Sequence, residues 1–115
     1  MGKDVLLIES DPFVQKLLVK LIEAANYTTV IAESGVTALE LLETRAFNLI
    51  TLDLQTPILD GDQFLKKLPL LAPTTPVVVI SDDNQEVKPH PQIKAAISKP
   101  FHFEHLLTLI ACYIA

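Results

Sequence analysis

The sequence predicts an α/β domain in which a doubly wound parallel sheet is covered by helices on both faces. Short apolar runs rich in β-branched residues alternate with longer segments whose apolar residues recur at helical spacing. Repeated strand and helix alternation within 115 residues is typical of a sheet with right-handed crossovers. A chain of this length usually forms one core, so we expect a single domain spanning residues 1–115.

The first two strand and helix units lie in the N-terminal part of the sequence. The run Asp4–Glu9 predicts a strand, and Asp11 can cap a helix that has Pro12 at its first position. Asn26 can adopt the left-handed conformation that ends this helix. The second unit is a β-branched strand and a helix that Ser34 can cap: Thr28–Ala32, followed by the apolar positions Val36, Leu39 and Leu42.

The central part of the sequence predicts two further strands. Asn48–Asp53 is a strand that ends in an acid, and the segment Asp60–Asp62 is expected to open the following helix. We expect Pro69 and Pro73 to close this helix, because proline lacks the amide donor that a helix interior needs. The next strand, Pro76–Ser81, is almost wholly apolar, as central parallel strands are.

The last unit departs from the regular alternation. Pro89 and Pro91 lie in the segment 82–92, where a fourth helix is expected. An interior proline costs about 3 kcal/mol in a helix, so this fourth helix is shortened to a turn or two at most. Lys94–Ser98 predicts the fifth strand, and a final helix is indicated by apolar residues at Phe103, Leu106, Leu107, Ile110 and Ile114.

Charge and composition exclude several classes of protein. Nine basic against fourteen acidic residues give a net charge of −5, which repels nucleic-acid backbones. The longest apolar stretch, Leu106–Ala115, is too short to cross a bilayer, which takes about 20 residues. Cys112 is the single cysteine and cannot form an internal disulfide. We therefore expect a soluble cytoplasmic domain that binds neither nucleic acid nor membrane.

Polar residues follow four of the predicted strands. In parallel sheets the ligand crevice lies beyond the carboxyl ends of the strands, where Glu9, Asp53, Ser81 and Lys99 are expected to converge. Two close carboxylates repel each other, and a hard cation such as Mg²⁺ relieves that repulsion. An acidic pocket with a cation and a lysine suits phosphoryl transfer to a carboxylate.

The sequence resembles the receiver domains of two-component response regulators along almost its whole length. In the phosphoacceptor segment of that family an Asp is followed by Pro four residues later and by Gly eight residues later. The matching segments are Val5–Pro12, Ala32–Leu42, Leu52–Gly61, Ile80–Ser81 and Ser98–Phe101. The resemblance implies a CheY-like, flavodoxin-like fold with strand order 2-1-3-4-5 and a function in phosphorelay signal transduction.

The same resemblance implies a role for each residue of the site. Asp53 would be phosphorylated by a partner histidine kinase or phosphotransfer protein, and the domain would signal by protein contact rather than act as an enzyme. Ser81 would bond the phosphate, Lys99 would pair with it, and the Lys99–Pro100 peptide bond would be cis. The implied ligands of Mg²⁺ are Glu9, Asp53, the backbone carbonyl of Gln55, and Asp11 if its side chain turns inward.

Three departures from the family pattern qualify these roles. Ser10 stands where the family has a second acid, so we expect Mg²⁺ to bind weakly. Ala96 occupies the position of the family's aromatic switch residue, and the stretch between Ser81 and Lys99 is short. These departures favour an alternative function, a degenerate receiver that acts as an interaction module independently of phosphorylation.

A third alternative is a small phosphohydrolase of the haloacid dehalogenase type. Such enzymes also use an aspartate nucleophile at a strand end, but they need a second Asp two residues later as the acid–base group. That position is Gln55, which argues against this enzyme class.

The final helix carries a second apolar stripe besides its core positions. Leu109, Cys112 and Tyr113 lie close together on this helix, with His105 beside them. With the fourth helix cut down, the flank of the last helix is expected to be uncovered. We therefore predict a surface for a downstream protein partner or for self-association at this helix.

Overall fold

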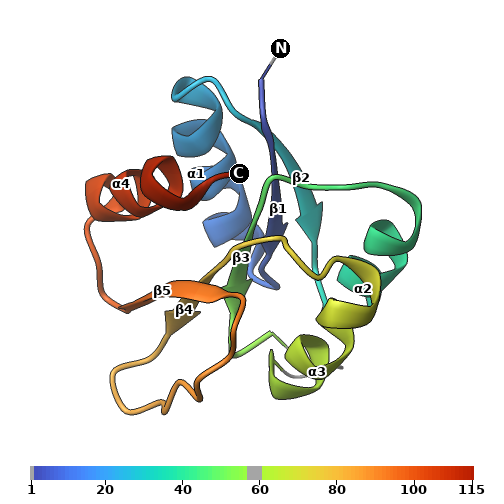
Figure 1. Cartoon of the computed structure of the whole chain (residues 1–115). Helices are drawn as coiled ribbons and strands as arrows, with labels where there is room; N and C mark the ends of the chain where they lie inside the picture. Colours follow the sequence, from blue (N-terminus) through green and yellow to red (C-terminus); the bar gives the residue numbers. More distant parts are fainter. Residues whose placement is uncertain (1, 57–60) are drawn as a thin grey trace.

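The computed structural model describes residues 2–56 and 61–115, and it confirms the predicted fold class (Figure 1). Five strands form one sheet in the order β2-β1-β3-β4-β5, and all of their pairings are parallel. The strands are β1 (Asp4–Ile8), β2 (Thr28–Ala32), β3 (Leu49–Asp53), β4 (Val77–Ser81) and β5 (Ile93–Ser98). The helices are α1 (Pro12–Ala24), α2 (Gly35–Thr44), α3 (Gly61–Leu71) and α4 (Phe103–Tyr113).

Each face of the sheet packs against its own pair of helices. Figure 1 shows α1 and α4 together on one side of the sheet, and α2 and α3 on the other. Successive residues of a strand point to opposite faces, so Val5 and Leu7 pack toward α1 and α4. Leu6 and Ile8 pack with residues of α2 and α3. No described helix is both long and apolar enough to cross a membrane.

Local signals set the helix ends as the sequence predicts. The Asp11 carboxylate accepts a hydrogen bond from the Phe13 amide at 2.8 Å and caps α1. Asn26 follows α1 with φ of 72°, in the left-handed conformation. Ser34 Oγ accepts a hydrogen bond from the Thr37 amide and caps α2. The predicted opening of the next helix at Asp60 lies outside the described residues.

The prediction that Pro69 closes the third helix is wrong, because α3 continues to Leu71. Proline has no amide hydrogen, so the Leu65 carbonyl loses its usual donor four residues later. His90 Nε2 lies 2.9 Å from that oxygen and replaces the donor. The Gln92 amide donates to His90 Nδ1 at 3.1 Å, which assigns the donated hydrogen to Nε2. A tertiary contact therefore lets the helix extend past a proline.

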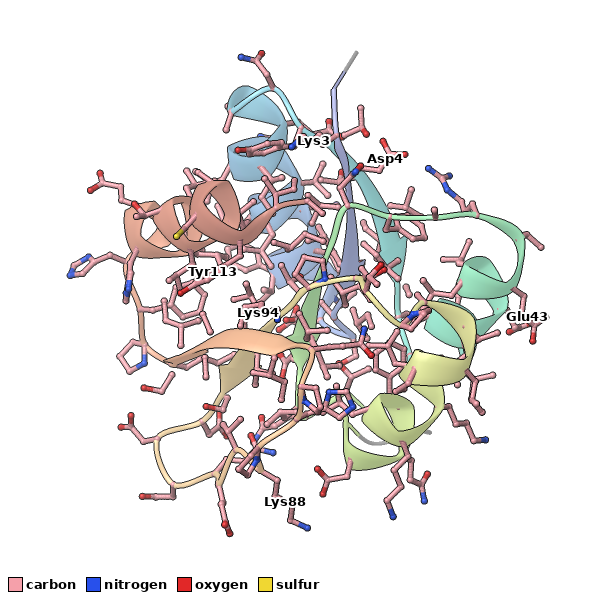
Figure 2. All side chains as sticks on the ribbon, in the orientation of Figure 1. Lys3, Asp4, Glu43, Lys88, Lys94 and Tyr113 are labelled. Carbon is pink, nitrogen blue, oxygen red and sulfur yellow. The ribbon has the colours of Figure 1, made fainter. Side chains whose placement is uncertain are left out.

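The segment between β4 and β5 lacks even the turn or two of helix that the sequence allows. Residues 82–92 form turns and extended chain with no helix (Figure 1). Buried Gln92 ties this segment down by donating from its side-chain amide to the carbonyls of Ala72 and Thr75 at 2.7 and 2.9 Å. Val87 packs against the core beneath, whereas Lys88 projects outward (Figure 2).

We expect His90→Ala to destabilise the domain by about 1 kcal/mol, because it leaves the Leu65 carbonyl without a donor. In a Pro69→Ala background the new amide at position 69 supplies that donor, so the same substitution should cost less. Urea unfolding of the two single variants and the double variant measures the difference. Equal costs in both backgrounds would show that the contact with Leu65 contributes nothing.

Candidate functional site

The polar residues predicted to converge do meet at the carboxyl edge of the sheet. Asp53 ends β3, Ser81 ends β4, and Glu9 and Lys99 directly follow β1 and β5. Glu9, Asp53 and Ser81 are buried, while Lys99 is partly exposed. Adjacent parallel strands run in register here, and this places residues far apart in sequence around one point.

Asp53 is the centre of this arrangement. Its carboxylate oxygen Oδ2 lies 2.8 Å from Lys99 Nζ, and Oδ1 accepts a hydrogen bond from the Gln55 amide at 2.9 Å. Only 3% of the residue is exposed. Both oxygens therefore have a donor, and the carboxylate is held in one orientation at the rim of the sheet.

Lys99 is positioned by backbone as well as by charge. Its amide donates to the Ser81 carbonyl at 2.8 Å, and the Lys99–Pro100 peptide bond is cis, as the family resemblance implies. Burial alone would lower the pKa of the Lys99 ammonium. The hydrogen bond and the charge of Asp53 outweigh burial, so this pKa lies above its ordinary value. Lys99 is consequently a stable cation beside the carboxylate.

Glu9 is the residue of this group whose ionised form is disfavoured by its surroundings. It is 3% exposed, its Oε2 accepts from the Asp11 amide at 3.1 Å, and its buried Oε1 has no hydrogen-bond partner. Burial and the neighbouring Asp53 carboxylate raise the pKa of Glu9 to about 7. A positive group beside Oε1 would stabilise the ionised form.

The other predicted ligands lie at the margin of the site. The Asp11 carboxylate faces its own helix as the cap of α1, so it would have to leave that cap to reach a cation. Gln55 is exposed, and its side-chain amide donates to the Asp82 carboxylate. Ser10 is exposed and brings no negative charge. Among residues 2–56 and 61–115, no three or more His, Cys, Asp or Glu side chains are grouped to hold a metal ion.

Sequence reasoning missed two features of this region. One is the contact between Gln55 and Asp82, which joins two loops that no sequence spacing relates. The other is an apolar pocket of about 290 Å³ beside Glu9 and Lys99. The helical spacing of Val14 and Leu17 on α1 could have indicated part of the wall of this pocket. Phe101 lines the pocket from the other side only in the folded chain, so no sequence pattern predicts its position.

Comparison with known proteins gives the same family that the motifs indicate. Residues 5–111 match the family of response regulator receiver domains. The polar-differentiation response regulator DivK of Brucella ovis is 29% identical over 123 residues, covering 99% of this chain and 98% of that protein. DivK of Brucella anthropi is 28% identical with the same coverage.

Solved structures share the fold at low sequence identity. A signal receiver domain of an HD domain-containing protein from Pseudomonas fluorescens has a TM-score of 0.88 at 23% identity, covering 98% of this chain and 94% of that one. The receiver domain of a sensor histidine kinase from Pseudomonas aeruginosa, solved with a magnesium ion in its active site cleft, has a TM-score of 0.87 at 17% identity, covering 98% of both chains. With its sheet order, its convergent strand-end residues and the family match over 5–111, this chain belongs to the response regulator receiver domains of two-component signalling.

Proposed function

We propose that this domain lies in the cytoplasm, that Asp53 accepts a phosphoryl group from a histidine kinase or phosphotransfer protein, and that the domain then signals by protein contact. The observation that carries this proposal is the buried Asp53 carboxylate with Lys99 Nζ at 2.8 Å. A carboxylate fixed beside a permanent cation at the mouth of a parallel sheet is suited to receive a phosphoryl group. In this proposal the domain accepts a phosphoryl group and does not catalyse repeated turnover of a substrate.

In the transfer, an Asp53 oxygen attacks phosphorus while the bond from phosphorus to the donor's histidine nitrogen breaks. The electron pair of that bond stays on the imidazole nitrogen, which takes up a proton from solvent, so the products are an acyl phosphate and a neutral histidine side chain on the donor. The Lys99 ammonium then faces the transferred oxygens and offsets their negative charge. We assign the Ser81 hydroxyl, on the neighbouring strand, to donate a hydrogen bond to the new phosphate.

The residues present fit a weakly held Mg²⁺ ion. Glu9, Asp53 and the backbone carbonyl of Gln55 would hold it, and a cation would satisfy the buried, unpartnered Glu9 Oε1. Such an ion supplies positive charge to the transferring oxygens when it is bound. Ser10, in place of a second acid, and the capping role of Asp11 both reduce the negative charge available to attract it.

Incubation with Mg²⁺ and acetyl phosphate, followed by intact mass measurement, tests the proposal. We expect the wild-type chain to gain the mass of one phosphoryl group, and Asp53→Asn to gain none. Asp82→Asn is a matched control, because Asp82 contacts the same loop but is not the proposed acceptor. A wild-type chain that stays unmodified, or an Asp53→Asn chain that is still modified, would contradict the assignment.

A receiver that acts independently of phosphorylation is the second candidate. Ser10 carries no charge, Ala96 is exposed on β5 and offers no aromatic ring, and residues 82–92 form no helix. If acetyl phosphate leaves the mass unchanged while partner binding persists in Asp53→Asn, this function replaces the first.

We place the partner or self-association surface on α4. Tyr113 is 38% exposed on this helix (Figure 2), and Cys112 and His105 are exposed near it. Leu109, expected to share this stripe, is half-buried and packs against the core, so it is a poor site for a charged substitution.

Tyr113→Glu together with Cys112→Glu should abolish association while leaving the fold intact, because both side chains are exposed. Sedimentation and binding measurements on the full chain check this. Ala111→Glu is the control, since it is exposed but lies about 200° around the helix from Tyr113. If association is unchanged in the double variant, the association surface does not include Cys112 and Tyr113.

A further inference from the structure

A groove of about 500 Å³ runs along α1 and is bordered by β2, the strand at one edge of the sheet (Figure 1). Pockets for small molecules usually measure about 300–1,000 Å³, so this groove, called here the α1 groove, has the size of a ligand site. Its lining residues come from α1 and β2: Phe13, Lys16, Leu17, Val19, Lys20 and Ile31. No residue of the candidate phosphoacceptor site lines it.

The apolar side chains of the α1 groove are accessible from solvent. Phe13 is 74% exposed and Ile31 is 39% exposed, which is unusual for side chains of this size. Leu17 and Val19 are half-buried and add further apolar surface. Covering these side chains removes apolar surface from water, so the groove favours a ligand with an apolar part.

The charged side chains of the α1 groove have one sign. Lys16 and Lys20 are both exposed and lie four residues apart on α1, a spacing at which like charges repel each other. In the described part of the chain neither lysine forms an ion pair. Glu23, the next acid along α1, accepts a hydrogen bond from Thr29 Oγ1 at 2.8 Å. A carboxylate that accepts from both ammonium groups would offset their repulsion.

Neither half of this surface is sufficient alone. An ion pair that is fully exposed to solvent contributes little, so two lysines would not retain a small hydrophilic anion. An apolar chain attached to the carboxylate adds burial against the groove. The helix rises by about 10 Å between Phe13 and Lys20, which gives room for a medium-length alkyl chain beside the charged groups.

We propose that the α1 groove binds a free medium-chain alkyl carboxylate. Its carboxylate accepts hydrogen bonds from the ammonium groups of Lys16 and Lys20. Its chain lies against Phe13, Leu17 and Ile31. This site goes beyond the proposed phosphoryl transfer, because binding uses no residue of the phosphoacceptor site and needs no phosphodonor.

Titration of the full ¹⁵N-labelled chain with sodium octanoate at pH 7 and low ionic strength, followed by amide NMR, tests the site. We expect saturable binding with a Kd of about 1 mM, with shifts at the amides of Phe13, Leu17 and Ile31. Butyrate has the same charged group on a shorter chain and should bind at least about tenfold more weakly. Octylammonium has the same chain with the opposite charge and should shift these amides at least about tenfold more weakly.

Variants at exposed positions separate the charged and the apolar contributions. Lys16→Gln together with Lys20→Gln should weaken octanoate binding at least about fivefold, because glutamine keeps part of the side-chain stem but carries no charge. Lys66→Gln together with Lys67→Gln is the matched control, because it removes the same charge from exposed positions of α3 and should leave the Kd unchanged. Phe13→Ala should weaken octanoate at least about threefold.

Several results would overturn the proposal. They are equal binding of octylammonium at the groove amides, an equal loss in the α3 control, shifts confined to amides outside the groove, and no saturation by 20 mM, about twenty times the expected Kd. None of these outcomes depends on phosphoryl transfer, because no phosphodonor is present.

Discussion

Metal-free wild-type protein is expected to lose about 2 kcal/mol of stability between pH 5.5 and pH 8 through Glu9 alone, and Glu9→Gln should abolish this loss. The pKa of Glu9 is about 7 in the folded state because the side chain is buried beside Asp53, against an ordinary value of 4.5. Between these values the folded chain holds a proton that the unfolded chain has released. The contribution of Glu9 to stability therefore falls as pH rises through that window and is constant above it.

Urea unfolding in EDTA at the two pH values measures this effect. Glutamine keeps the size and hydrogen-bonding capacity of the side chain but has no charge to bury, so the variant should also exceed the wild type in stability at pH 8. Glu43→Gln is the matched control, because Glu43 is exposed near the C-terminal end of α2 (Figure 2) and is not a residue of the candidate site. If the wild type and Glu9→Gln respond equally to pH, the buried carboxylate does not control stability.

The raised pKa of Glu9 also predicts that a bound cation stabilises the fold. A carboxyl group that destabilises the fold when ionised is stabilised by any cation that binds Oε1, and binding to the folded state alone raises stability by mass action. Mg²⁺ added at pH 8 should therefore raise the unfolding midpoint of the wild type more than that of Glu9→Gln. The two carboxylates that would hold the ion, those of Glu9 and Asp53, are thus distinguishable by their separate effects on stability and phosphorylation.

Local sequence signals were sufficient for most of the fold. Caps at Asp11 and Ser34, the turn at Asn26 and the apolar strands each depend on residues close in sequence, and each is confirmed. The prediction at Pro69 is wrong because the compensating residue is distant in the sequence. The donor that compensates the missing amide is His90, which lies 21 positions away and reaches the helix only in the folded chain.

The candidate site likewise combines features that the sequence predicts with features that depend on tertiary contacts. The spacing around Asp53 and Lys99 placed both residues at strand ends, and their ion pair follows from the parallel sheet. The unpartnered oxygen and raised pKa of Glu9 could not be read from sequence, because they depend on how completely neighbouring chain segments bury it. The pocket beside it joins segments from α1, β4 and α4, which no local pattern relates.

Ser10→Asp is expected to raise Mg²⁺ affinity at least about tenfold, the largest gain that a single substitution at this site should give. Two unit charges 4 Å apart at an effective dielectric of about 20 attract by about 4 kcal/mol, and exposure of position 10 to solvent screens part of that. The remaining attraction adds to the Glu9 and Asp53 carboxylates, which alone supply the negative charge of the proposed cation site.

Titration with Mg²⁺ at pH 8, followed by calorimetry or amide shifts, compares three chains. Ser10→Asn is the matched control, because asparagine has the size of aspartate without its charge, and it should bind Mg²⁺ no better than the wild type. Equal affinity in Ser10→Asp and Ser10→Asn would mean that Asp11 has left the cap of α1 and already supplies the missing charge. If affinity rises and acetyl phosphate modifies only Ser10→Asp, the wild-type chain has lost phosphorylation through this one position, and the second candidate function is then the correct one.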